Sequence, residues 1–304
     1  AWATGWNEYG QLGDGTNSER KRPVQVMSNI QSAASGGYHT TFVKTDGTAW
    51  VTGWNNYGQL GDGTLSDRKK PFQVLSNIQS VSAGGHHTIF VKTDVTAWAT
   101  GYNGNGRLGD DTISNRNSSV QVLLNVQSAS AGGAHTTFVK MDGTAWATGW
   151  NHYGQLGDGT LSERKYPVQV LSNVQSASAG GYHTIFLKTD GTAWATGRND
   201  YGQLGDGTTV QRKSPVQVLS NVQSVSAGYW FTIFLKTDGT TWATGYNAFG
   251  QLGDGTASNR KSPVQVLSNV QSISAGSHHT IFVKTDGTAW ATGWNEYGQL
   301  GDGT

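Results

Sequence analysis

The sequence contains no cysteine, only five prolines and no long apolar run, and its charges nearly cancel. Without cysteine the chain can form no disulfide, no thiolate nucleophile and no Cys-based zinc site. Because no run reaches about 18 apolar residues, the sequence predicts no membrane-spanning helix. A net charge of +1 creates no overall field that would draw the chain to nucleic acid or to an acidic membrane.

What the sequence does contain is repetition, together with 43 glycines and 12 tryptophans. The repeat has a constant period of 48, with full units that begin at positions 1, 49, 97, 145, 193 and 241 and a partial unit that spans 289–304. This partial unit, 289–304, is identical in sequence to 1–16. The chain begins at Ala1 inside a motif, and we interpret it as a processed chain or an excerpt of a longer one.

Each unit contains four short runs typical of β-strands, AWATG, PVQVL, VQSVSAG and HTIFLKTD, and none has the periodicity of a helix. Ile185, Phe186 and Leu187 are consecutive apolar residues, which predicts a strand covered on both faces. Asp190 and Gly191 predict a two-residue hairpin turn with positive φ between HTIFLK and AWATG.

Four short strands in every repeat unit predict an all-β fold, a β-propeller of four-stranded blades that forms one domain over residues 1–304. A six-bladed ring needs only positions 1–288 and leaves 289–304 redundant, whereas seven repeats of 48 make 336, which is 32 more than the chain has. A third arrangement exchanges the identical ends between molecules. We favour a ring with an incomplete or overlapping closing blade.

GWNxYGQLGDGT, followed by PVQVL and AGGYHTIFLKTDGT, resembles the repeat of the regulator of chromosome condensation 1 (RCC1) family over essentially the whole chain. The resemblance implies seven blades, one of them completed from both chain ends. The near-identical repeats are more similar to those of bacterial members, so we expect an extracellular or cell-surface location on a bacterium.

Residues that recur in every unit are interpreted as structural. Five of the six full units have a histidine at one position, namely His39, His87, His135, His183 and His279, and the fifth unit has Phe231 there. The aspartate of each GDGT is expected to bond to nearby backbone in a turn. We expect no metal site, no cofactor and no catalytic residue, because no carboxylate pair or G-x-S-x-G elbow stands out.

Positions that differ between repeats are the candidate binding residues. The position before the histidine varies between large rings and one small residue, Ala134. Variable aromatic loop positions on a rigid scaffold favour recognition of a protein partner. The predicted partner-binding residues are Tyr38, His86, Tyr182, Tyr229, Trp230, His278 and Arg198.

A basic loop in each unit, such as Arg20–Arg22, predicts a basic belt, but the GDGT aspartates lie beside it and weaken its field. We therefore do not favour nucleic-acid binding. Repeat three departs from the others, with Val95 and Asp111 at positions where the other units have glycine. A β-branched residue tolerates positive φ poorly.

The favoured function is a non-enzymatic protein-interaction scaffold that binds a partner through one end face of the propeller. A self-associating, filament-forming repeat protein is the alternative, because the two ends are identical. The RCC1 resemblance also implies guanine-nucleotide exchange on a small GTPase. The founding member of that family acts through a protruding wedge, whereas all full units here have the same length and none carries an insertion.

Overall fold

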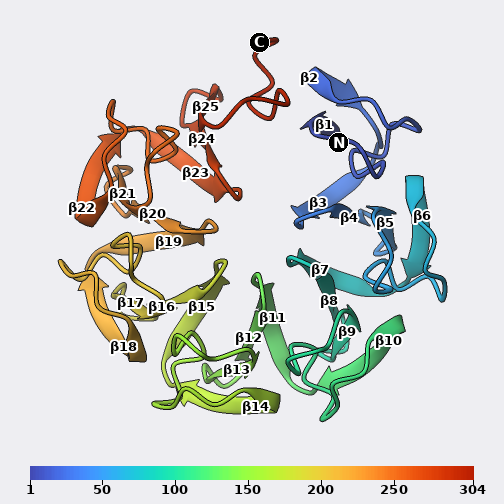
Figure 1. The fold of residues 1–304 in the computed structure, drawn as a ribbon, viewed down its shortest axis with the longest axis horizontal. Coiled ribbons are helices and arrows are strands. Elements are labelled where there is room, and N and C mark those ends of the chain that lie inside the picture. Colours follow the sequence, from blue (N-terminus) through green and yellow to red (C-terminus); the bar gives the residue numbers. More distant parts are fainter.

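The computed structural model describes residues 1–304 and consists of strands joined by turns and bends, without a helix. Seven sheets stand around a common axis, so the predicted propeller is confirmed (Figure 1). The structure contains no helix that is long and apolar enough to cross a membrane.

Strands occupy four positions in a blade, numbered from the axis outward. The innermost strands are β3 (Ile30–Ser35), β7 (Ile78–Ala83), β11 (Val126–Ala131), β15 (Val174–Ala179), β19 (Val222–Ala227) and β23 (Val270–Ala275). The second strands are β4 (His39–Lys44), β8 (His87–Lys92), β12 (His135–Lys140), β16 (His183–Lys188), β20 (Phe231–Lys236) and β24 (His279–Lys284). The third strands are β1 (Trp2–Gly5), β5 (Ala49–Gly53), β9 (Ala97–Gly101), β13 (Ala145–Gly149), β17 (Ala193–Gly197), β21 (Thr241–Gly245) and β25 (Ala289–Gly293). The outer strands are β2 (Arg20–Gln25), β6 (Arg68–Leu75), β10 (Arg116–Leu123), β14 (Arg164–Leu171), β18 (Arg212–Leu219) and β22 (Arg260–Leu267).

The ring closes with two incomplete sheets. Five sheets have four antiparallel strands, whereas β23–β24–β25 has three and β1–β2 has two. The first blade therefore lacks its two inner strands, and the last blade lacks its outer strand. Both chain ends lie at this junction, which we call the seam (Figure 1).

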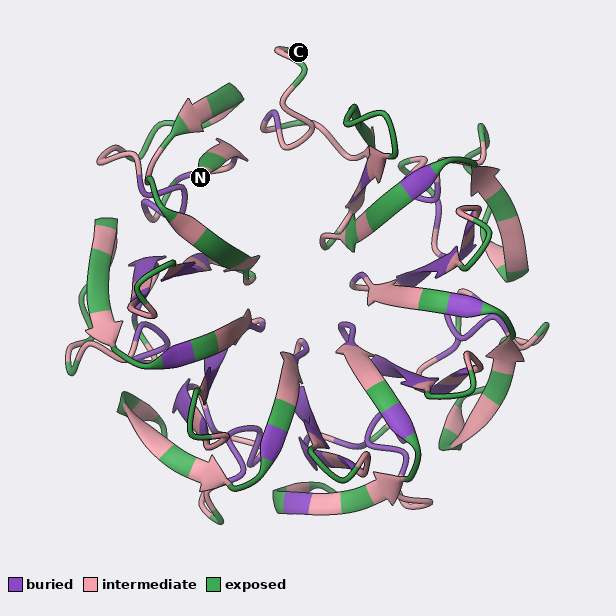
Figure 2. Cartoon of the chain, turned by 180° about the vertical axis from the view of Figure 1, so that it is seen from behind, coloured by how far each residue is buried: buried purple, intermediate pink, exposed green.

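The core lies between neighbouring blades. In the cluster around Ile185 and Leu187 of β16, the ring of Phe234 comes from β20 in the next blade. In the middle blades, such as that of β16 and β17, the second and third strands are buried on both faces, as Figure 2 shows in purple. The expectation for Ile185, Phe186 and Leu187 is confirmed, because each sheet hides its apolar faces only against its neighbours.

The loop of each GDGT motif joins its blade to the following one. The Gly15 amide donates to the Lys69 carbonyl on β6 at 2.8 Å, and the Thr52 hydroxyl donates to the Gly10 carbonyl at 2.9 Å. Gly10 has φ +76°, and a Cβ placed there would lie 2.6 Å from the Cα of Lys69. Only glycine allows this approach of the two backbones.

The hairpin between the second and third strands differs from the predicted two-residue turn. The Lys188 amide donates to the Thr192 carbonyl at 2.9 Å, which encloses a three-residue loop. Only Gly191 has positive φ (75°), as in a type I turn followed by one left-handed residue. The prediction was wrong because the Asp190 carboxylate accepts from the Thr192 amide and holds the wider loop.

Repeat three contains a strained residue in this hairpin. Val95 takes the left-handed position with φ +59°, and Gly143 has φ +76° at the equivalent place in the next repeat. A branched side chain in this region costs about 1–3 kcal/mol.

We therefore expect Val95→Gly to raise the free energy of unfolding by about 1 kcal/mol, after the greater entropy of glycine in the unfolded chain is subtracted. Chemical denaturation measures this change. Gly143→Val is the matched control and should destabilise the protein. A Val95→Gly protein no more stable than the unaltered chain would show that the position stores no strain.

Candidate protein-binding face

The loop before each second strand and the loop after each third strand lie at the same end of the ring, because these strands are antiparallel. His39 pairs with Gly53, so Tyr38 lies beside Trp54. Aromatic and imidazole rings from these two loops form what we call the aromatic rim. Its members are Trp6, Tyr9, Tyr38, Trp54, Tyr57, His86, Tyr102, Trp150, Tyr153, Tyr182, Tyr201, Tyr229, Trp230, Tyr246, Phe249, His278, Trp294 and Tyr297.

On the first blades, Tyr38 and His86 come together. Their rings are stacked with centroids 5.4 Å apart and an interplanar angle of 2°. Trp54 meets both rings edge-on at 5.4 and 5.3 Å. Burial, and then the nearby Arg107 cation, lower the pKa of His86 to about 4, so this imidazole is neutral at pH 7.

On the later blades, Tyr182, Tyr229, Trp230 and His278 form a second cluster. The Tyr229 hydroxyl donates to the Tyr182 hydroxyl at 2.9 Å, and burial together with this bond raises the pKa of Tyr229. Trp230 packs edge-on against Tyr229 at 4.8 Å and lies 5.6 Å from His278. All four side chains are half-buried, so part of each ring is exposed to solvent.

Arg198 stands where other repeats have a tryptophan or tyrosine of the rim, and it is already engaged within the chain. Its guanidinium lies 4.9 Å from the centroid of the Tyr153 ring. Its Nε donates to Asp200 at 2.6 Å, so its charge is balanced locally. The Arg198 guanidinium is therefore not a free cation in this structure.

The rim has a single interruption, in repeat three. It crosses the seam, where the Trp6 and Tyr297 rings are 6.0 Å apart. Between Tyr102 and Trp150, however, Asn105 and Ala134 stand where other repeats have rings.

Arg107 fills the interruption, and it was not among the predicted residues. It is 4% exposed and lies 4.6 Å from the centroid of the Tyr102 ring. It donates to the Gly133 carbonyl at 3.0 Å and to Asn105 at 2.8 Å, and Asn105 in turn donates to Glu163 at 2.9 Å. Burial lowers the pKa of Arg107 to about 10, so the group is still a cation at pH 7. The sequence indicated Arg107 only by one change, because the other repeats have glutamine at this position of the YGQLGDG motif.

The repeated histidines are structural, as predicted. His87, at the interface between two blades, is fully buried and its Nε2 lies 2.9 Å from the Thr136 hydroxyl of the next blade. Because that hydroxyl donates its own hydrogen to the Arg107 carbonyl, the imidazole must donate. The same bond joins His39 to Thr88, His135 to Thr184 and His183 to Thr232. Neither partner is available as a nucleophile.

Each GDGT aspartate of a complete unit neutralises one arginine of the basic loop beside it. Asp158 accepts from the amide and hydroxyl of Thr160 and pairs with Arg164 at 2.6 Å. Burial would raise the pKa of Asp158, but these hydrogen bonds outweigh it and lower the pKa. Each of the six complete units has this ion pair, which confirms the expected local neutralisation.

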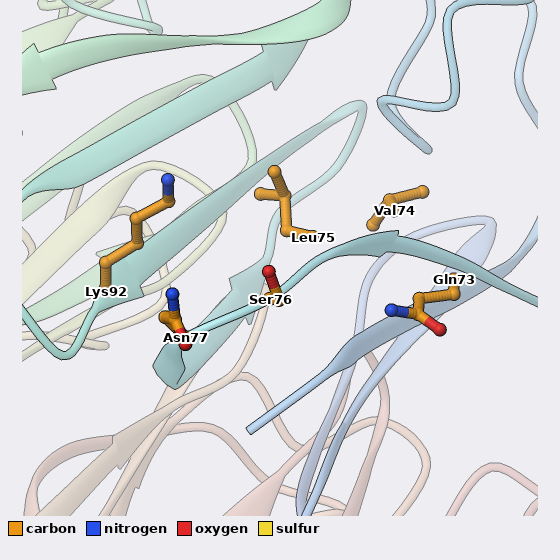
Figure 3. Close-up of a pocket in the computed structure, with 6 residues that line it drawn as sticks. All are labelled: Gln73, Val74, Leu75, Ser76, Asn77 and Lys92. Carbon is orange, nitrogen blue, oxygen red and sulfur yellow. The ribbon is translucent and has the colours of Figure 1, made fainter. Parts of the chain in front are cut away.

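A hollow in the surface lies near Lys92, at the end of β8 that is opposite to the rim. Figure 3 shows an open hollow lined by Gln73, Val74, Leu75, Ser76, Asn77 and Lys92. The Lys92 amine already lies over the Trp98 ring at 4.2 Å. No group of three or more His, Asp or Glu side chains is gathered where it could hold a metal ion.

The buried histidines make stability depend on pH. Burial lowers the pKa of His135 and of His183 from 6.5 to about 3. The unfolded chain therefore takes up protons below pH 6.5 that the folded chain cannot bind. We expect the free energy of unfolding to be fully present above pH 6.5 and to fall by about 1.4 kcal/mol per pH unit for each such histidine as the pH drops toward 3.

Denaturation at pH values between 7 and 5 measures this slope before the carboxylates titrate. The control is His135→Phe, because Phe231 already occupies the equivalent position. This variant should reduce the slope by about 1.4 kcal/mol per pH unit. An unchanged slope would contradict a buried neutral His135.

Comparisons of the sequence and of the structure with known proteins both find RCC1 repeats. The family model of the regulator of chromosome condensation (RCC1) repeat matches this sequence at residues 1–43, 46–91, 142–187, 190–235 and 238–283. No curated protein sequence matches the chain.

Among solved structures, human WBSCR16 is similar with a TM-score of 0.89 and 21% identity, covering 100% of this chain and 90% of that one. Yeast RCC1 (Prp20), solved bound to Kap60, has a TM-score of 0.87 and 22% identity, covering 99% and 80%. Prp20p from Saccharomyces cerevisiae, described with its binding to Gsp1p and histones, has a TM-score of 0.87 and 23% identity, covering 100% and 82%. At this identity the likeness establishes the fold.

Proposed function

The chain belongs to the RCC1 repeat family, and on that premise we propose that it is a non-enzymatic scaffold that binds a protein partner through the aromatic rim. Propellers of this family commonly mediate protein interactions. The observation that carries the proposal is the rim itself, which is continuous around one end face except at Arg107. Half-buried rings held by their neighbours lose little side-chain entropy when a partner covers them.

The cluster around Trp230 is the proposed centre of the contact. Repeat five carries Tyr229 and Trp230 where its neighbour, repeat four, has Gly181 and Tyr182, so it places the most aromatic surface at one point. Trp and Tyr at the centre of an interface commonly carry most of its binding free energy. His278 and Tyr182, on either side, would enclose this centre and exclude water.

The electrostatics of the rim favour a partner that brings apolar and hydrogen-bonding groups. His86 is neutral, and Arg198 is paired with Asp200. In each basic loop one arginine is paired with the aspartate of the same unit, which weakens the attraction of the loop for phosphate. We therefore propose an ordinary protein surface as the partner rather than nucleic acid.

The test is a double variant, Tyr229→Ala with Trp230→Ala. Affinity capture from the source organism with the unaltered protein identifies the partner, and titration calorimetry then compares affinities. We expect the double variant to bind at least about thirtyfold more weakly, since one central aromatic is worth about 2 kcal/mol.

The matched control changes two exposed aromatics of the outer strands, Phe72→Ala with Tyr166→Ala, which should leave the affinity unchanged. Thermal unfolding shows that both double variants are folded. If the Tyr229/Trp230 variant binds the purified partner as tightly as the unaltered chain, the rim is not the binding face.

A further inference from the structure

The interruption of the aromatic rim in repeat three holds an unusual charge. Arg107 is 4% exposed, and it is the only arginine, lysine, aspartate or glutamate among the buried residues of this structure. The other buried ionisable side chains are histidines, which are neutral at pH 7 because burial lowers their pKa. A charge removed from water is costly unless an opposite charge or several hydrogen bonds compensate it.

No carboxylate pairs with the Arg107 cation. Seven other arginines each form an ion pair with an aspartate, and Arg107 is in none of these pairs. A guanidinium has five N–H donors. The protein offers this one two acceptors, the Gly133 carbonyl and the Asn105 amide oxygen, and both are neutral. The Nε atom is buried and has no acceptor.

Asn105 separates Arg107 from the carboxylate of Glu163. Its amide oxygen accepts from Nη2 of Arg107 at 2.8 Å, and its Nδ2 donates to Glu163 at 2.9 Å. Glu163 is exposed and also lies 3.7 Å from Nε2 of His152. Asn105 is half-buried, so it reaches solvent while it contacts the buried guanidinium. A carboxylate in place of its amide oxygen would form a charge-assisted bond, which is roughly twice as strong.

The interruption adjoins the aromatic cluster around Trp230. Burial lowers the pKa of Arg107, and the neighbouring side chains of Tyr102 and Tyr182 act in the opposite direction. The Tyr182 hydroxyl in turn accepts from Tyr229 at 2.9 Å. A partner that covers Tyr229 and Trp230 is therefore close enough to reach repeat three, where Ala134 takes the place of a ring.

We propose that the interruption is the specificity site of the aromatic rim and receives an aspartate or glutamate side chain of the protein partner. The carboxylate displaces the Asn105 amide oxygen and accepts from Nη2 of Arg107. This inference rests on the proposed function, because it assumes that the partner covers the rim. It adds the chemistry of the partner, which is one acidic residue opposite repeat three beside an apolar contact at Trp230.

The first test compares two capped peptides, acetyl-Tyr-Asp-Tyr-amide and acetyl-Tyr-Asn-Tyr-amide, by titration calorimetry with the whole chain. Their tyrosines can contact the rings on either side of the interruption, and only the first peptide has a carboxylate. We expect the Asp peptide to bind at least about tenfold more tightly at low salt, and this preference to shrink as salt screens the charges.

Three variants assign the preference to the proposed contact. Arg107→Gln introduces the residue that other repeats have, such as Gln59 and Gln155, so it should fold, and it should bind both peptides equally. Arg22→Gln removes an exposed arginine of β2 and is the matched control, which should keep the preference. Asn105→Ala removes the competing acceptor and should bind the Asp peptide more tightly than the unaltered chain does.

The proposal is overturned if the Asp peptide does not bind, if both peptides bind equally to the unaltered chain, or if Arg107→Gln keeps the preference. An Asn105→Ala chain that binds the Asp peptide no more tightly would show that the carboxylate does not take the position of the amide. Thermal unfolding shows that each variant is folded.

The purified partner then separates this proposal from the proposed function. We expect Arg107→Gln to weaken partner binding at least about tenfold at low salt. If the Tyr229/Trp230 variant weakens binding and Arg107→Gln does not, the specificity site is wrong and the rim is still the binding face. If the Tyr229/Trp230 variant binds normally, the proposed function itself is wrong.

Discussion

The contact between one blade and the next is the interaction on which the whole structure depends. A four-stranded sheet of this size has two apolar faces and cannot hide either of them alone. The neighbouring blade covers them, as Phe234 covers Ile185 and Leu187. Hydrogen bonds accompany this packing, from a loop glycine to an outer strand as between Gly15 and Lys69, and from a buried histidine to a threonine at four of the junctions.

The same contact explains both the candidate face and the seam. Because each blade packs against the next in the same way, equivalent residues lie at the same level along the propeller axis. The aromatic side chains of the two loops therefore meet around one end of the propeller and form the rim. Where the junction is incomplete, at β25 and β1, the residues that are buried elsewhere become exposed. The aromatic rim and the exposed residues of β25 and β1 are thus two consequences of one repeated interface.

Much of this architecture could be predicted from the repeat. The constant period, the strand-forming runs and the turn residues indicate the blades of a propeller. The position of Tyr38 directly before the strand that begins at His39 indicates that the Tyr38 side chain lies in a loop at one end of the blade. The structural role of the histidines could also be predicted, because Phe231, which cannot bind a metal, occupies the equivalent position in one unit.

Other features depend on contacts between units that a single repeat does not contain. The prediction did not include Tyr9 and its equivalents, because a tyrosine present in most units reads as structural until its neighbours across the junction are known. Arg107 was missed because a single substitution in a long repeat does not show its partner, and Gly133, which accepts from its guanidinium, lies on another loop. The sequence also did not show that the first blade lacks two strands and the last blade lacks one. This arrangement follows from a ring of seven rather than six blades.

Hydrogen exchange, resolved by peptide and mass, tests the central claim most directly. If the ring has seven positions with one open seam, amides of β25 and β1 should exchange much faster than those of β9 and β13, which are paired on both edges. Equal protection of β25 and β9 would contradict this account, because it would mean that the chain closes its ring without a seam.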